Sequence, residues 1–168
     1  RHHPSLLKAT MTQNFAIYPS LNGKTVFVSG GAQGIGAEIV RAFAAQGAKV
    51  GFLDIDEAAS RALADDLPGV TYELCDLRDI TALQAALASL KARIGAAEVL
   101  VNNTARDDRH GWQDVTPDYW DERQATNLRH MFFAIQTVAP DMIAAGGGSI
   151  INMGSNSWWE AGGGFPAY

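Results

Sequence analysis

The first residues whose types and spacing suggest chemistry are three glycines near the start of the chain. In the segment SGGAQGIG, Gly30, Gly34 and Gly36 follow a G-x-x-x-G-x-G pattern between an apolar run and a helical pattern. Glycines let the backbone turn sharply and bring its N–H groups close to a pyrophosphate, and a following helix N-terminus adds about half a positive charge. The spacing alone also fits a tight turn, but the strand before it and the helix after it favour a dinucleotide-binding loop.

One acidic residue, Asp54, is placed to select the cofactor. It ends the next apolar run, 18 residues after Gly36. A carboxylate at this point accepts hydrogen bonds from both ribose hydroxyls of adenosine and repels a 2′-phosphate. Ile55 and Asp56 follow it, and the glycine loop contains no Lys or Arg. These residues predict NAD rather than NADP, with an ordinary surface carboxylate as the alternative.

Two hydroxyl-bearing residues and an asparagine form a second set of candidates. Ser155 follows an apolar run and precedes Tyr168 by 13 residues, and Asn127 lies in a long helical pattern. A serine and a tyrosine can hydrogen-bond a reacting oxygen and move its proton. A free tyrosine has a pKa of about 10, so acting as a base at pH 7 needs a shift of about three units, or about 4 kcal/mol. Considered singly, Tyr168 also fits a packed aromatic, Asn127 an exposed helix residue, and Ser157 competes with Ser155.

Apolar runs that alternate with helical patterns indicate the elements that position these residues. Strands are predicted at 24–29, 49–54, 70–75, 98–103 and 148–153. Helices are predicted from Ile35 to a cap at Gly47, over 56–69, along 80–90, and from Thr116 to about Pro140, where the pattern predicts a break or kink. This order predicts an α/β fold, a Rossmann-type doubly wound parallel sheet truncated after the fifth strand. Helices would cover both faces, and ligands would bind at the carboxyl ends of the strands.

The chain is predicted to hold one domain. Its 168 residues suffice to bury a core, and its hydrophobic share of 47% and charged share of 18% are typical of globular proteins. Residues 21–168 are predicted to form a dinucleotide-binding Rossmann domain. Residues 1–20 are an N-terminal extension, of which 1–10 resemble a tag or an upstream read-through. His2 and His3 are therefore interpreted as cloning residues rather than metal ligands.

Composition argues against several classes of protein. The net charge is −5 and Lys and Arg form no block, which disfavours binding to nucleic acid or an anionic membrane. The longest apolar stretch is interrupted by polar residues and a proline, and the N-terminus lacks a signal-peptide pattern. The one cysteine, Cys75, ends an apolar run, which predicts a buried thiol in a reducing compartment such as the cytoplasm. His110 and His130 belong to no ligand cluster, so no metal site is predicted.

The glycine loop, Asn102-Asn103, Ser155 and Tyr168 together resemble the short-chain dehydrogenase/reductase family, from about Leu21 to Tyr168. That family's loop reads T-G-x-x-x-G-x-G, and here Ser29 replaces the threonine and keeps its hydroxyl. NNTA, residues 102–105, departs from the family's N-N-A-G and adds bulk beside the nicotinamide ribose. The resemblance implies NAD contacts by Ser29, Gly30, Gln33, Gly34, Ile35, Gly36, Asp54, Ile55, Asp76, Leu77, Asn103, Thr104 and Ala105.

The resemblance also implies catalytic roles. Tyr168 would take the proton of the substrate hydroxyl, Ser155 would hydrogen-bond the reacting oxygen, and Asn127 would hold a water that links a lysine to solvent. The family has this lysine four residues after the tyrosine, beyond residue 168, so we expect the 168-residue chain by itself to be nearly inactive. Family members are commonly tetramers, so we also expect a homo-oligomer.

Four further motifs narrow the resemblance. DDRH (107–110), YWDER (119–123), NLRHMFF (127–133) and MGSNSW (153–158) resemble bacterial aldose 1-dehydrogenases of the D-xylose dehydrogenase type. This implies NAD-dependent oxidation of the C1 hydroxyl of an aldose to an aldonolactone. The candidate sugar contacts are Asp108, Arg109, Asn156 and Trp158.

Alternatives remain open for these contacts and for the activity. A solvated loop also explains Asp108 and Arg109, and packing in a core or an interface also explains Trp158. The alternative activities are a short-chain dehydrogenase for a polyol, 3-ketoacyl or steroid substrate, and a non-catalytic NAD-binding protein.

Overall fold

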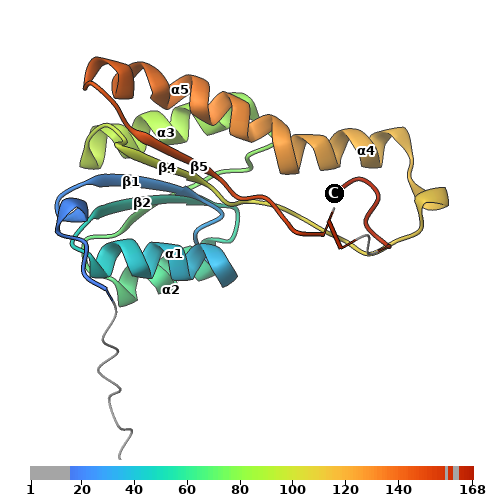
Figure 1. Ribbon diagram of the computed structural model, residues 1–168, viewed down its shortest axis with the longest axis horizontal. Coiled ribbons are helices and arrows are strands. Elements are labelled where there is room, and N and C mark those ends of the chain that lie inside the picture. The colour runs from blue at the N-terminus through green and yellow to red at the C-terminus, as the bar shows by residue number, and fades with distance from the viewer. Residues whose placement is uncertain (1–15, 158, 161–162) are drawn as a thin grey trace, which may run out of the picture.

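A parallel five-stranded sheet in the order β3-β2-β1-β4-β5 forms the centre of the molecule in the computed structural model, which describes residues 16–157, 159–160 and 163–168 (Figure 1). The strands are β1 (Thr25–Ser29), β2 (Lys49–Asp54), β3 (Thr71–Leu74), β4 (Val99–Asn102) and β5 (Ser149–Asn152). All four strand pairs are parallel. The strand order reverses between β1 and β4, and the crevice at such a point is where open α/β sheets bind ligands.

Helices cover the sheet on both faces. Helices α1 (Gly34–Ala45) and α2 (Glu57–Asp66) lie on one face, and α3 (Ile80–Ile94) and α5 (His130–Ala144) lie on the other (Figure 1). Helix α4 (Pro117–Gln124) and the π-helical segment η3 (Ala125–Arg129) lead into α5 and extend past the carboxyl ends of the strands. Two short 3-10 turns are η1 (Pro19–Leu21) and η2 (Trp112–Asp114). The predicted doubly wound α/β layout is confirmed.

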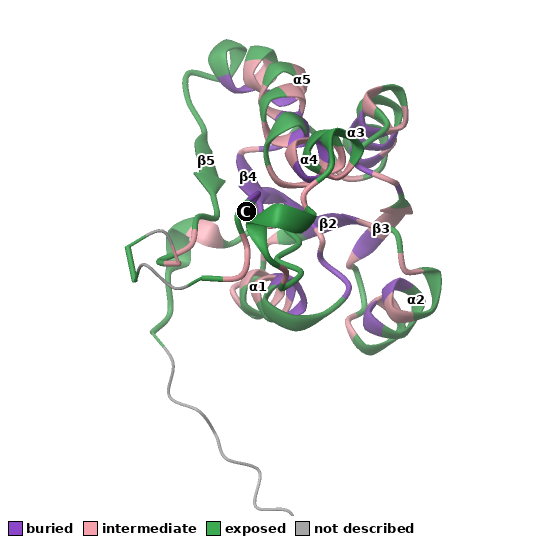
Figure 2. Cartoon of the chain, turned by 90° about the vertical axis from the view of Figure 1, so that its right-hand side faces the viewer, coloured by how far each residue is buried: buried purple, intermediate pink, exposed green. Residues whose placement is uncertain are grey.

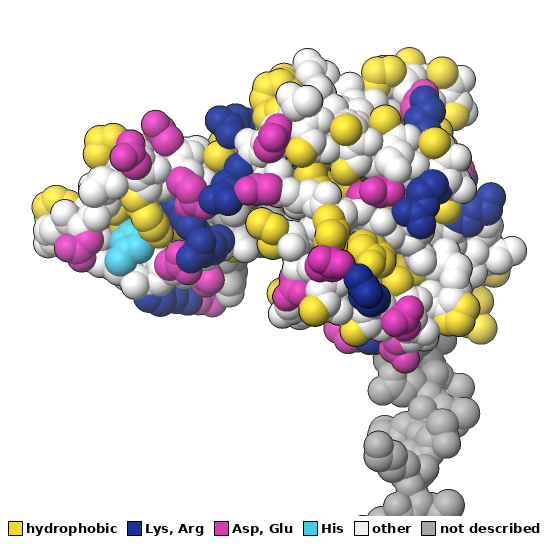
Figure 3. Space-filling view, turned by 180° about the vertical axis from the view of Figure 1, so that it is seen from behind, with side chains coloured by type: hydrophobic (Ala, Val, Ile, Leu, Met, Phe, Trp, Pro, Cys, Tyr) yellow, Lys and Arg dark blue, Asp and Glu magenta, His cyan; other side chains and the backbone are white. Residues whose placement is uncertain are grey.

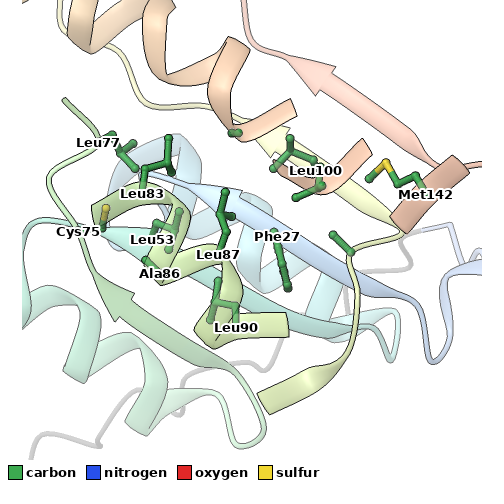
Figure 4. Packing of buried hydrophobic residues seen from close by; sticks show 13 residues of the cluster. Phe27, Leu53, Cys75, Leu77, Leu83, Ala86, Leu87, Leu90, Leu100 and Met142 are labelled. Atoms are coloured by element: carbon green, nitrogen blue, oxygen red, sulfur yellow. The ribbon is translucent and has the colours of Figure 1, made fainter. Parts of the chain in front are cut away.

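Alternation of side chains along β1 divides the core into two layers. Val26 and Val28 pack with Val40 of α1, whereas Phe27 packs with Leu87 of α3. Figure 4 shows the second layer, where leucines of α3 meet Phe27 and Leu100 of the sheet and Met142 of α5. Complete burial of each large apolar side chain contributes about 1.5–3 kcal/mol. The rigid sheet thus fixes the strand ends at which ligands bind.

Side-chain caps explain where three helices begin. The carboxylate of Asp56 accepts a hydrogen bond from the backbone N–H of Ala59 (2.9 Å), and Asp79 does the same for α3. The Thr116 hydroxyl accepts one from the N–H of Tyr119, and Pro117 occupies the first turn. These caps satisfy N–H groups that lack an intrahelical partner.

The break expected at Pro140 is wrong, because α5 continues through it to Ala144. Proline lacks one N–H, but Val138 and Met142 on either side are 5% exposed and pack into the core. This packing holds the helix together. The irregularity lies instead at η3, where the pattern predicted a continuous helix.

Strand β5 lies at the edge of the sheet and differs from the other strands in burial. Ile150 is 38% and Ile151 43% exposed within the described residues, and Figure 2 shows β5 beyond the helices that cover β1 and β4. The expectation that the whole sheet is covered therefore holds for the inner strands and not for β5. Within the described ranges, none of the helices is long and apolar enough to cross a bilayer.

Candidate active site

The glycine loop between β1 and α1 adopts a conformation that requires glycine at two of its positions. Gly30 has a φ of 66°, which L side chains rarely adopt. A Cβ at Gly36 would lie 1.8 Å from the carbonyl oxygen of Gly30. The backbone of the loop therefore packs tightly against the start of α1, which is where the sequence predicted a pyrophosphate to bind.

Ser29 and Asn103 connect this loop to the end of β4. The Ser29 hydroxyl oxygen accepts hydrogen bonds from the backbone N–H groups of Asn103 (3.0 Å) and Thr104 (3.2 Å). The amide of Asn103 donates to the Gly30 carbonyl at 3.0 Å. Thr104 packs against the loop, because a Cβ on Gly30 would lie 2.6 Å from its hydroxyl oxygen. Thr104 thus fits beside the loop and leaves Asn103 in contact with it.

Asp54 is held at the end of β2 by two backbone groups. Its carboxylate accepts hydrogen bonds from the N–H of Ala32 at 2.9 Å and the N–H of Asp56 at 3.0 Å. The half-buried carboxylate is therefore oriented before any ligand arrives.

A cavity, which we call the cofactor cavity, opens along the carboxyl ends of β1, β2, β3 and β4. It brings together all the predicted cofactor residues except two: Ser29, buried behind the loop, and Gly34. The predicted cofactor residues that line the cavity are Gly30, Gln33, Ile35, Gly36, Asp54, Ile55, Asp76, Leu77, Asn103, Thr104 and Ala105. A cradle of loop backbone, a fixed carboxylate and apolar side chains at Ile55 and Leu77 fits a dinucleotide.

Two arginines that the sequence analysis did not predict also line the cofactor cavity. Arg78 donates to Asp76 through Nη2 at 2.6 Å and to Glu122 of α4 through Nη1 at 3.1 Å. Arg106 pairs with Asp108 at 2.9 Å. Hydrogen bonding by Arg78 lowers the pKa of the Asp76 carboxyl. Both arginines thus already have carboxylate partners within the protein.

Cys75 lies beside this cavity as a buried free thiol, as predicted. Burial, with a smaller contribution from Asp76, raises the pKa of the Cys75 thiol to about 11. It therefore stays protonated at neutral pH. Among the described residues, no group of three or more His, Cys, Asp or Glu side chains is arranged to hold a metal ion.

A second cavity, which we call the substrate cavity, lies between the loop after β4 and the loop after β5. It brings together the three predicted catalytic residues, Asn127, Ser155 and Tyr168. Tyr168, Ala105, Met153 and Gly154 line both cavities. The two cavities therefore adjoin at Tyr168, whose side chain can face a cofactor on one side and a substrate on the other.

Ser155 and the competing Ser157 are hydrogen-bonded to each other. The Ser155 hydroxyl donates to the Ser157 hydroxyl at 2.8 Å and accepts from the Ser157 backbone N–H at 3.1 Å. Both serines line the substrate cavity. Ser157 thus orients the Ser155 hydroxyl.

Asn127 lies in the π-helical segment η3, and the oxygen and the nitrogen of its side-chain amide both form hydrogen bonds to the loop after β4. Its oxygen accepts from the backbone N–H of Arg106 at 2.7 Å, and its nitrogen donates to the Arg106 carbonyl at 3.1 Å. Single π-helical turns are frequent at functional sites because they re-aim side chains. The sequence pattern predicted the residue and not the distorted turn that aims it.

Three of the predicted sugar contacts, Asp108, Arg109 and Asn156, are not among the described residues that line the substrate cavity. Asp108 pairs with Arg106 and with Arg123 of α4 at 3.4 Å. The guanidinium of Arg109 lies 4.2 Å from the centroid of the Phe165 ring, and Asn156 donates to Glu160. Trp158 lies outside the described residues. These sugar contacts stay predictions.

Several residues that do line the substrate cavity were not predicted as substrate contacts, notably His110, Trp112, Met131 and Phe165. Trp112 is 72% exposed and stands in η2. The only sequence signal was that His110 belongs to the DDRH motif and Met131 to the NLRHMFF motif. Loop and π-helical geometry decides which members of such motifs reach the cavity.

The face of the molecule shown in Figure 3 carries no single-sign patch. Acidic and basic side chains alternate there, and the lobe that contains α4 projects from the body of the molecule.

Comparison with known proteins identifies the family of the chain. The family model described as short chain dehydrogenase matches residues 24–168. The chain is 52% identical over 147 residues to a D-xylose 1-dehydrogenase of Caulobacter vibrioides, covering 85% of this chain and 58% of the relative. It is 45% identical over 150 residues to a probable galactose dehydrogenase of Rhizobium meliloti, covering 86% of this chain and 59% of the relative.

A solved structure of an actinorhodin polyketide ketoreductase variant with NADPH is similar with a TM-score of 0.82 and 25% identity, covering 91% of this chain and 60% of that one. The chain thus spans less than two thirds of the length of the relatives it matches. The predicted resemblance, including the likeness to D-xylose dehydrogenases, is confirmed. With its glycine loop, its Asn103 and a cavity that joins Ser155 to Tyr168, the chain belongs to the short-chain dehydrogenase family.

Proposed function

We propose that the full-length protein is an NAD-dependent oxidoreductase that oxidises the C1 hydroxyl of an aldose to the aldonolactone. The observation that carries the proposal is the position of Tyr168, which lines both the cofactor cavity and the substrate cavity. A carbon held against Ser155 and Tyr168 would lie where the two cavities adjoin. A hydroxyl on that carbon can lose its proton to the protein while the carbon loses its hydride to a cofactor at the same place.

The protein's own residues would handle the proton. The Ser155 hydroxyl would turn from Ser157 to donate a hydrogen bond to the C1 oxygen of the sugar, and Tyr168 would accept the proton of the sugar hydroxyl. The O–H and C1–H bonds break, the C1 oxygen forms a double bond to C1, and the sugar ring, already closed, becomes a lactone. A nicotinamide cofactor, when bound, accepts the hydride from C1. Asn127 holds the loop after β4 through Arg106, which keeps the cavity wall in place.

NAD is proposed over NADP because Asp54 is fixed by two backbone N–H groups in the cofactor cavity. A 2′-phosphate would approach this carboxylate, and the two arginines of the cavity are already paired with Asp76, Glu122 and Asp108. Repulsion between the Asp54 carboxylate and the 2′-phosphate, which neither of these paired arginines is free to neutralise, disfavours NADP.

An aldose is proposed as the substrate because two relatives at 52% and 45% identity are named for D-xylose and galactose. The proposed sugar contacts remain Asp108, Arg109, Asn156 and Trp158. Trp112 joins them, because its exposed ring in the substrate cavity offers a flat apolar surface for the C–H face of a pyranose.

The test is a substrate panel with the full-length protein. Pentoses, hexoses and polyols are assayed with NAD and with NADP, and a 3-ketoacyl substrate is assayed with NADH and with NADPH. Absorbance of the reduced nicotinamide measures turnover, and hydroxamate trapping follows lactone formation. We expect the highest kcat/KM for a pentose or hexose aldose with NAD, and a trapped lactone. Turnover of a polyol or 3-ketoacyl substrate without any aldose would favour the alternative dehydrogenases. NAD binding without turnover of any alcohol would favour the non-catalytic alternative.

The proposal also covers the cellular compartment and the oligomeric state of the enzyme. The buried thiol of Cys75 suits a reducing compartment, and we propose the cytoplasm. We also propose a homo-tetramer, which light scattering on the full-length protein tests. The 168-residue chain alone is proposed to be nearly inactive, and dehydrogenase turnover by that purified chain would contradict this.

A further inference from the structure

We propose that contacts between α4, the loop after β4 and the loop after β5 act as a clasp that positions the ring of Tyr168 for the proposed reaction, on which this inference rests. The clasp is defined by the contacts of Arg109, His110, Tyr119 and Phe165. Two of these residues belong to the DDRH motif and one to the YWDER motif. Neither motif has a role in binding the cofactor, so their joint role is open.

The anchoring end of the clasp is on α4. The hydroxyl of Tyr119 lies 2.6 Å from Nε2 of His110, and the two ring centroids are 4.6 Å apart at 89°. Nδ1 of His110 lies 3.0 Å from the carbonyl oxygen of Gly111, which can only accept a hydrogen bond. In neutral His110 the proton is therefore on Nδ1, and the Tyr119 hydroxyl donates to Nε2. Nε2 thus holds the loop to α4, and Nδ1 holds the imidazole against the backbone of its own loop.

Arg123 reinforces this anchor from inside α4. Its side chain is only 4% exposed, its guanidinium carbon lies 5.1 Å from the Tyr119 ring centroid, and it pairs with Asp108 of the same loop at 3.4 Å. A buried guanidinium paired in this way is costly to move. The loop is therefore fixed to α4 at Asp108 and at His110.

The other end of the clasp reaches the loop that carries Tyr168. The backbone N–H of His110 donates to the Gly164 carbonyl at 2.7 Å, and the Arg109 guanidinium lies 4.2 Å from the Phe165 centroid. The rings of Phe165 and Tyr168 pack edge to face, with their centroids 6.1 Å apart and an angle of 85° between the ring planes. A continuous series of contacts therefore leads from the Tyr119 hydroxyl to the Tyr168 ring. Tyr119 lines neither cavity, so an effect of its hydroxyl on turnover must pass through these contacts.

The experiment removes one hydroxyl from the anchor. Tyr119→Phe in the full-length protein keeps the ring beside His110 and Arg123, and Tyr18→Phe, which removes a hydroxyl from an exposed tyrosine before β1, is the matched control. We expect kcat for the best aldose to fall about 10-fold in Tyr119→Phe, with Tm and the Kd for NAD unchanged. Hydrogen exchange at the His110 amide and across residues 163–168 should become about 10-fold faster. Phe165→Leu should lower kcat similarly, and the double variant should lose less than the product of the two single losses.

Two outcomes would overturn the proposal that the clasp positions Tyr168. One is a Tyr119→Phe enzyme whose kcat and hydrogen exchange match Tyr18→Phe, which would leave the contacts without a role. The other is a parallel fall in Tm, NAD affinity and kcat, which would make Tyr119 a stabilising residue only. The hydrogen-exchange measurement needs no sugar, so a parent protein that turns over no aldose refutes the proposed function while the clasp is still decided.

Discussion

The cofactor cavity and the substrate cavity adjoin at Tyr168, but different kinds of contact hold them. Strand ends and backbone groups form the cofactor cavity: Asp54 is fixed by two N–H groups, and Gly36 is fitted against the Gly30 carbonyl. Loops form the substrate cavity, and they are joined by the Arg109 guanidinium over the Phe165 ring and by a backbone hydrogen bond from His110 to Gly164. Backbone positioned by a sheet tolerates little change, whereas side-chain contacts between loops can be exchanged one at a time.

This difference separates two tasks within one site. The binding of a common cofactor depends on a rigid frame, and the choice of substrate depends on loops placed upon that frame. Substitutions in the first region should therefore change affinity for NAD, and those in the second should change turnover of the sugar. The predictions below test that separation.

The largest effect is expected at the residue shared by the two cavities. Tyr168→Phe removes the group that takes the substrate proton, so kcat for the best aldose should fall about 1,000-fold. The Kd for NAD should stay within about 2-fold, because the ring is retained. Steady-state kinetics and fluorescence titration with NAD measure the two values, and Tyr18→Phe is the control. A variant that retains a tenth of the parent kcat would remove Tyr168 from the proposed mechanism.

The next effect tests the backbone frame. Gly36→Ala places a Cβ 1.8 Å from the Gly30 carbonyl oxygen, so the loop must shift. We expect the Kd for NAD to rise about 100-fold, which corresponds to about 2.7 kcal/mol. Gly34→Asn is the matched control, because Gly34 has open space around its Cβ position and a φ of 54° that Asn tolerates. Equal losses in the two variants would show that close approach at Gly36 is not the cause.

A smaller effect concerns the choice of cofactor. Asp54→Asn keeps the shape of the side chain and removes its charge, so the ratio of kcat/KM for NADP over NAD should rise about 50-fold, or about 2.3 kcal/mol. Asp65→Asn makes the same change of net charge on the exposed surface of α2. An unchanged ratio in Asp54→Asn would move the source of selectivity to other residues of the cofactor cavity.

Most of the predicted cofactor residues line one cavity because they follow a local rule. Gly30, Gly36 and Asp54 lie within one strand–helix–strand unit, and the register of β1 on β2 brings them together. Asn103 joins them because β4 lies next to β1 in the sheet. The spacing of such residues along the chain therefore carries most of the geometry.

The substrate side was less predictable because its geometry arises from contacts between distant loops. Nothing in the spacing of His110 and Tyr119 shows that their side chains meet, or that Gly164 accepts the His110 N–H. The π-helical turn at Asn127 and the continuation of α5 past Pro140 depend on packing against the core. Loops take their conformation from such contacts, and propensity does not determine them.

The smallest effect concerns the scaffold that carries both regions. His130 begins α5, is fully buried, and burial lowers its pKa to about 4 from an ordinary value of about 6.5. Because the folded-state pKa is the lower one, the unfolded chain binds more protons below pH 6.5, and stability is lost as the pH falls from there toward 4. Between pH 7 and pH 5 this group should remove about 2 kcal/mol from the free energy of unfolding.

Urea unfolding of the parent and of His130→Met at the two pH values measures this loss. Other groups titrate in both proteins, so the contribution of His130 is the difference between the two proteins in how far the free energy of unfolding falls from pH 7 to pH 5. That fall should be about 2 kcal/mol smaller in the variant than in the parent. Hydrogen exchange of residues 163–168 below the transition should show no matching change, because His130 belongs to the helix and not to the clasp. Equal changes in the free energy of unfolding between the two pH values in the two proteins would mean that His130 does not govern the response to acid.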